Sequence, residues 1–111
     1  MGASLISGRS TESGRRADLA SVLKQLANLA AELPEEAAAS ALHQYATELA
    51  ANTPGPQVRK TRENVLRLLR AGPGSLSDQY FVDDSGHPDA ERSDRFVKLI
   101  EIARKRARRL S

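Results

Sequence analysis

The chain has 111 residues, of which 40% are hydrophobic and only 4% aromatic, with no cysteine and a formal net charge of +3. The lack of cysteine excludes disulfides, thiolate metal sites and cysteine nucleophiles, and no apolar run approaches the about 20 residues that a membrane-spanning helix needs. We therefore expect a single soluble, cytoplasmic domain without a membrane partner. Its abundant alanine and leucine favour helices.

The N-terminal part divides into a leader and a first helix. Residues 1–14 are rich in glycine and serine and lack periodicity, which predicts a disordered leader before one helical domain over residues 15–111. From Arg15, apolar residues recur at steps of three and four, as is typical of one helix face. This face comprises Leu19, Val22, Leu23, Leu26, Leu29, Ala30 and Leu33. Pro34 is expected to end this helix and to open the next.

Two further helices are predicted in the middle of the chain. The second covers about residues 34–51 and is rich in alanine, which permits a close approach of a neighbouring helix. Residues 52–56, with the sequence NTPGP, break the pattern. A third helix is expected over residues 56–71, with an exterior formed by Arg59, Arg62, Arg67 and Arg70. The short first connection predicts an antiparallel pair of helices.

A break at Gly72-Pro73-Gly74 separates the third helix from a short apolar piece at residues 80–82. Residues 83–86 have the composition of a turn, and the last helix is expected from about residue 88 to residue 109. The predicted fold class is therefore all-α. We expect a compact four-helix domain in which an ordered apolar connection packs Tyr80 and Phe81 across the helix ends.

Charge is strongly segregated along the chain. Residues 75–94 carry one basic and six acidic side chains, whereas residues 95–111 carry seven basic and one acidic. Such blocks indicate a charged partner surface more than the net charge does. The acidic block does not follow the spacing of a calcium loop. Its acids suit a turn and a helix start, and they also suit an acidic docking patch for a basic protein. The predicted patch comprises Asp83, Asp84, Asp89 and Glu91, with Tyr80 beside them.

The basic end of the last helix has two interpretations. Its cations are Arg104, Lys105, Arg106, Arg108 and Arg109. They could contact phosphates of a nucleic acid, or they could simply favour the negative pole of the helix dipole. No aromatic residue interleaves them to stack on bases, so we rank the second interpretation above the first.

Catalytic and cofactor sites are not indicated. His43 and His87 are isolated in the sequence, and no spacing brings a serine or a second histidine to either of them. Gly72-Pro73-Gly74 does not fit a phosphate-binding loop, because proline lacks the amide donor. We therefore expect no enzymatic activity and no cofactor.

Gly72, Gly74, Ser75 and Asp78 form a Gly-x-Gly-Ser-x-x-Asp pattern ahead of a helix rich in arginine, leucine and alanine. This pattern resembles a group of small bacterial all-helical proteins of unassigned function, from which Leu76 and Ser77 depart. Proteins of this size and type are often immunity or antitoxin partners of toxins. The resemblance thus implies an inhibitory protein-binding role. The cations of the last helix leave a nucleic-acid-binding or regulatory protein as the alternative. A homodimer through the alanine-rich second helix is a third hypothesis.

Overall fold

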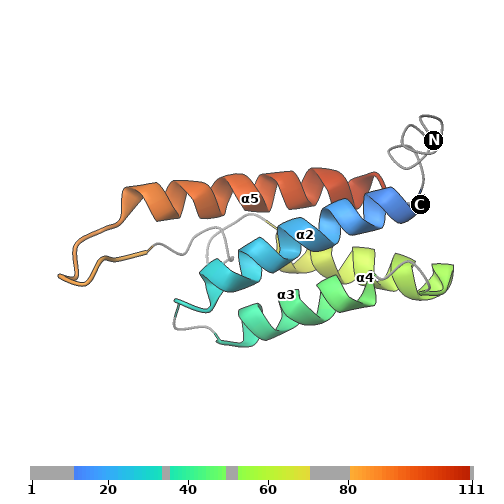
Figure 1. Cartoon of the computed structure of the whole chain (residues 1–111), viewed down its shortest axis with the longest axis horizontal. Helices are drawn as coiled ribbons and strands as arrows, with labels where there is room; N and C mark the ends of the chain where they lie inside the picture. Colours follow the sequence, from blue (N-terminus) through green and yellow to red (C-terminus); the bar gives the residue numbers. More distant parts are fainter. Residues whose placement is uncertain (1–11, 34–35, 50–52, 71–80, 111) are drawn as a thin grey trace, which may run out of the picture.

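The computed structural model describes residues 12–33, 36–49, 53–70 and 81–110, which form four helices running alternately up and down (Figure 1). They are α2 (Glu12–Ala30), α3 (Glu36–Glu48), α4 (Gly55–Leu68) and α5 (Ala90–Arg108). Helix α2 packs against α3 and α5, and α4 packs against the same two helices. The predicted all-α, four-helix domain and the antiparallel first pair are confirmed.

The core consists of one face of each helix, as the apolar spacing predicts. Its largest fully buried side chains include Leu19, Leu23, Leu26, Leu42, Val58, Val65, Leu69, Phe96 and Ile100. Ala38, Ala39 and Ala46 of α3 are also buried within this core. These three alanines pack within the chain's own bundle, whereas Ala37 is exposed, and the homodimer through this helix stays a prediction.

Several predicted boundaries shift. Helix α2 begins at Glu12, three residues before Arg15, so the predicted leader is three residues too long at its end. Helix α5 begins at Ala90 with Asp89 as its N-cap, whose side chain accepts a hydrogen bond from the Arg92 amide at 3.0 Å. Residues 1–11, the first helix junction at Pro34, and residues 71–80 with Tyr80 lie outside the described residues.

Two polar contacts tie α4 to its neighbours. Thr61 is fully buried, and its hydroxyl donates to the Glu48 carboxylate at the end of α3 at 2.7 Å. Arg62 was expected on the exterior but is half-buried, because its Nε donates to the Ala107 carbonyl in the last turn of α5 at 2.9 Å. The same carbonyl also accepts a hydrogen bond from the Leu110 amide at 3.1 Å. Arg62 therefore supplies a second donor to the end of α5 from a neighbouring helix.

Candidate functional site

Three residues of the predicted acidic patch, Asp83, Asp84 and Asp89, lie on a hairpin formed by residues 81–89, which we call the acidic hairpin, and Glu91 lies in the first turn of α5. Val82 and Pro88 form an antiparallel bridge. The Asp83 amide donates to the His87 carbonyl at 2.8 Å, and the Asp89 amide donates to the Phe81 carbonyl at 2.7 Å. In Figure 1 this hairpin projects beyond the helices at the end of the bundle where α5 begins.

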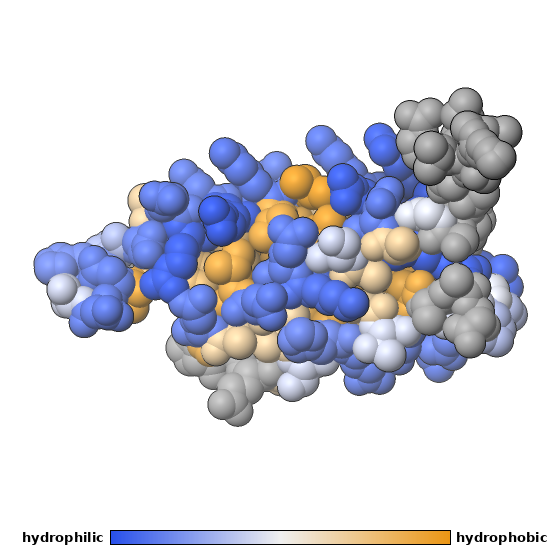
Figure 2. Space-filling model, in the orientation of Figure 1, coloured by the Kyte–Doolittle hydropathy of each residue, from blue (hydrophilic) through white to orange (hydrophobic). Residues whose placement is uncertain are grey.

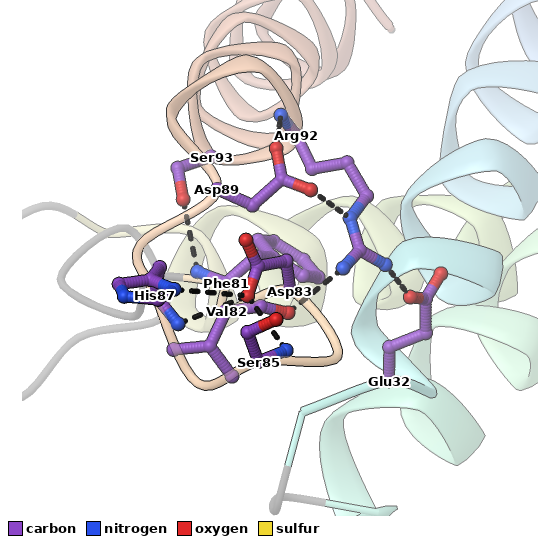
Figure 3. A network of polar contacts seen from close by, with 9 residues as sticks. All are labelled: Glu32, Phe81, Val82, Asp83, Ser85, His87, Asp89, Arg92 and Ser93. Atoms are coloured by element: carbon purple, nitrogen blue, oxygen red, sulfur yellow. Dashed lines mark hydrogen bonds and ion pairs between the residues drawn. The ribbon is translucent and has the colours of Figure 1, made fainter.

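Asp83 forms the turn at the tip of the hairpin. Its Oδ1 accepts hydrogen bonds from the amides of Ser85 at 2.9 Å and of His87 at 3.0 Å (Figure 3). Gly86 adopts a φ of +84°, a left-handed conformation that L side chains disfavour. Its amide donates back to the Asp83 carbonyl at 3.0 Å. The Asp83 carboxylate is thus partly committed to holding the backbone.

Arg92 anchors the base of the hairpin. Its Nε donates to Asp89 Oδ2 at 2.8 Å, and its guanidinium also bonds the Glu32 carboxylate, just beyond the end of α2. A third donor reaches the Val82 carbonyl at 2.9 Å, and the guanidinium carbon lies 5.5 Å from the Phe81 ring centroid. Figure 3 shows this one side chain joining the hairpin, the start of α5 and the segment after α2.

Phe81 attaches the hairpin to the core. Its side chain is only 3% exposed, and its ring meets the Phe96 ring edge-on with centroids 5.3 Å apart. The Phe81 amide donates to the Ser93 hydroxyl at 2.9 Å. The neighbouring Val82 is 46% exposed. Adjacent residues of an extended segment point to opposite sides, so only one of the pair can enter the core.

The structure divides the predicted docking residues into two groups. Asp83, which is exposed, takes part in the turn and Asp89 in the Arg92 network, whereas Asp84 and Glu91 are exposed and take part in neither. No ion pair within the described residues engages either of the latter two. Figure 2 shows hydrophilic side chains covering the projecting end of the molecule. Tyr80 lies outside the described residues.

Arg92 and Glu32 were missed by the sequence analysis. The spacing of Asp89 and Arg92, three apart at a helix start, is a signal that could have indicated their pairing. No comparable signal exists for Glu32, which lies 60 residues from Arg92 in the chain.

The predicted basic residues lie at the end of α5. Lys105, Arg106, Arg108 and Arg109 are exposed, and Arg104 is half-buried. No ion pair between described residues involves them. Arg106 and Arg109 also line a surface cavity of about 330 Å³ together with Arg15 and Asp18 of α2. The five cations thus surround most of the helix end instead of forming a single flat surface.

The histidines lie apart. His43 is exposed on α3, and the His87 ring nitrogen is 3.9 Å from the Asp83 carboxylate at the exposed tip of the hairpin. Over the described residues, no group of three or more His, Asp or Glu side chains is placed to hold a metal ion.

Within the same part of the chain, no helix is both long and apolar enough to cross a bilayer.

Comparison of the chain with protein-family models, with curated proteins and with solved structures finds no match.

Proposed function

We propose that this chain is a non-enzymatic protein-binding module, an inhibitor of the immunity or antitoxin type that acts in the cytoplasm on a bacterial toxin. The observation that carries the proposal is the acidic hairpin, whose backbone is fixed while Asp84 and the apolar Val82 side chain remain exposed. A preordered loop loses little conformational entropy on binding. A rigid, projecting loop is therefore a suitable element for occluding a partner's active site.

The chemistry of the hairpin favours a basic partner surface. The exposed Asp84 and Glu91 carboxylates steer a cationic surface toward the hairpin. Val82 supplies apolar area that a partner can bury, at about 25 cal/mol per Å². Arg92 neutralises Asp89 internally, so Asp89 contributes to the shape of the hairpin more than to its field.

The adjacent reading frame supplies a direct test. We expect its product to arrest growth when expressed alone and to be neutralised by co-expression of this chain. We expect Asp84→Lys to weaken the complex at least tenfold in a titration. Asp83→Asn is the matched control, because asparagine removes the charge but can still accept the two amide hydrogen bonds of the turn. Equal binding by Asp84→Lys and by the unmodified chain would refute docking through the hairpin.

Nucleic-acid binding is the second candidate function, and the exposed cations at the end of α5 support it. Phosphate contacts would make the affinity fall steeply with salt. Fluorescence anisotropy with a labelled duplex at two salt concentrations separates the two functions. Tight binding that Arg108→Ala and Arg109→Ala abolish would favour this candidate over protein docking.

A further inference from the structure

One surface cavity lies between the first two turns of α2 and the end of α5. Its volume is about 330 Å³, and all four side chains that line it are charged, namely Arg15, Asp18, Arg106 and Arg109. Residues three apart share one face of a helix, so each helix contributes a pair of neighbouring side chains. Figure 1 shows the start of α2 beside the end of α5, since the two helices run in opposite directions. The cavity therefore exists only when the bundle is folded.

This cavity carries a net positive charge. Three guanidinium groups share it with one carboxylate, and no ion pair between the described residues joins Asp18 to any of them. The positive dipole end of α2 and the negative dipole end of α5 meet here and largely cancel, so the field comes from the side chains. An arginine can donate two parallel hydrogen bonds to a phosphate. The lining of the cavity therefore suits a phosphate group.

Cations extend beyond the cavity over this end of the bundle, where α2 and α4 begin and α3 and α5 end. Residues 104–109 contain five cations and no carboxylate, and residues 59–62 of α4 add three more cations. The described carboxylates of this end are Asp18, Glu48, Glu63 and Glu101. Of these, Glu48 accepts hydrogen bonds from Thr61 and Gln44. The excess of positive charge extends over three helices, which favours a polyanion over a single phosphate ion.

A second cavity flanks the end of α5 on its other side. It has a volume of about 110 Å³ and is lined by three cations and one carboxylate, namely Glu101, Arg104, Lys105 and Arg108. With 3.6 residues per turn, Arg104 and Arg106 point about 160° apart around the helix axis. The helix between the two cavities is about 10–12 Å in diameter, close to the width of about 12 Å of the major groove of a DNA duplex. Such a helix end can reach phosphates on both edges of a groove, which a flat membrane surface does not offer.

We propose that the cavity between α2 and α5 binds a backbone phosphate of a nucleic-acid duplex, and that the second cavity binds a phosphate on the other edge of the groove. This inference rests on the second candidate function and adds to it a contact from α2. A duplex is favoured over a single strand because the described aromatic rings, Tyr45, Phe81 and Phe96, pack in or against the core and are not free to stack on bases. Phosphate contacts carry no sequence information, so we expect similar affinity for unrelated duplex sequences.

Fluorescence anisotropy of a labelled duplex, titrated with the full chain over a series of salt concentrations, tests the inference. Each phosphate contact adds about 0.9 to the slope of log affinity against log salt. We therefore expect Arg15→Gln to reduce that slope by about 0.9 and the affinity about five- to tenfold near 0.1 M salt. Lys24→Gln is the matched control, for which we expect no change. Lys24 is an exposed cation of α2 that points about 180° away from Arg15 and lies about 13.5 Å further along the helix.

Asp18→Asn provides a test that loss of folding cannot imitate. It removes the carboxylate of the cavity, so the duplex should bind about two- to threefold more tightly. If Arg15→Gln bound like Lys24→Gln while Arg108→Ala weakened binding, nucleic-acid binding would stand and the cavity between α2 and α5 would have no part in it. If the unmodified chain did not bind the duplex even at 0.05 M salt, the second candidate function and this inference would both be wrong. Binding of inorganic phosphate, or of phosphatidylglycerol vesicles, as tight as that of the duplex would also overturn the inference.

Discussion

Replacing Arg92 with alanine should release the acidic hairpin while leaving the four-helix core intact. The side chain contacts three separate parts of the fold, namely the hairpin backbone, the start of α5 and Glu32 beyond α2. Its removal also leaves the Glu32 and Asp89 carboxylates without their common cation. The core loses no apolar side chain, because Phe81 and Phe96 remain in place. The loss should therefore be local.

The size of this loss of stability follows from the contacts of the Arg92 guanidinium. The hydrogen bond to the Val82 carbonyl has a charged donor and contributes about 1.5 kcal/mol. The ion pairs with Asp89 and Glu32 are partly exposed and contribute about 0.5 kcal/mol each. The contact over the Phe81 ring adds about 0.5 kcal/mol. Contacts of one side chain are not strictly additive. We therefore expect the free energy of local unfolding of the hairpin to fall by about 2–3 kcal/mol.

Hydrogen exchange measures this loss where it occurs. The amides of Asp83, Gly86 and Asp89 are hydrogen-bonded within the hairpin. A loss of about 2–3 kcal/mol should speed their exchange by about 30- to 150-fold, whereas core amides of α2 should change little. Arg95→Ala is the control, because Arg95 is an exposed arginine of the same helix. If Arg92→Ala and Arg95→Ala gave the same exchange rates, Arg92 would not anchor the hairpin.

Three other predictions concern stability, measured by urea denaturation. Phe96→Ala should lower the free energy of unfolding by about 3–5 kcal/mol, because its ring is fully buried against Phe81; a loss below about 1 kcal/mol would contradict that packing. Gly86→Ala should cost about 1 kcal/mol through its positive φ alone, since no atom lies within 4 Å of the added carbon, and Gly86→Asn should cost less. Thr61→Val should cost about 1 kcal/mol by removing the hydrogen bond to Glu48, whereas Thr61→Ser, which keeps the hydroxyl, should retain that bond.

The helical core could be predicted because burial of one face leaves a repeat of three and four residues in the sequence. Leu19, Leu42 and Val65 are fully buried where that repeat places them. Thr61 was missed, because a polar residue at an inward position breaks the hydrophobic pattern. Its burial depends on a carboxylate from α3, and that pairing exists only once α3 and α4 are packed.

The candidate site was only partly predictable for a related reason. Turn composition indicated the tip of the hairpin, and the acids indicated a helix start, although Asp89 is the N-cap and not a first-turn residue of a helix that begins at residue 88. Sequence spacing could not show that Glu32 joins Arg92, since tertiary packing alone brings α2 and α5 together. It also could not show that Val82 faces solvent while Phe81 enters the core, because both residues are equally apolar.

Counting charges along the chain therefore overstates the negative charge that the hairpin presents to a partner. Asp83 and Asp89 hold the hairpin, so the field that a partner meets comes mainly from Asp84 and from Glu91 in the first turn of α5. The two pairs of acids should then respond differently to substitution. Asp84→Lys and Glu91→Arg should each weaken binding to the proposed toxin, whereas Asp89→Asn should change that binding less, because Arg92 already pairs with the Asp89 carboxylate. If Asp89→Asn weakened binding as much as Asp84→Lys, the charge of Asp89 would act on the partner as well, and the separation of roles would be wrong.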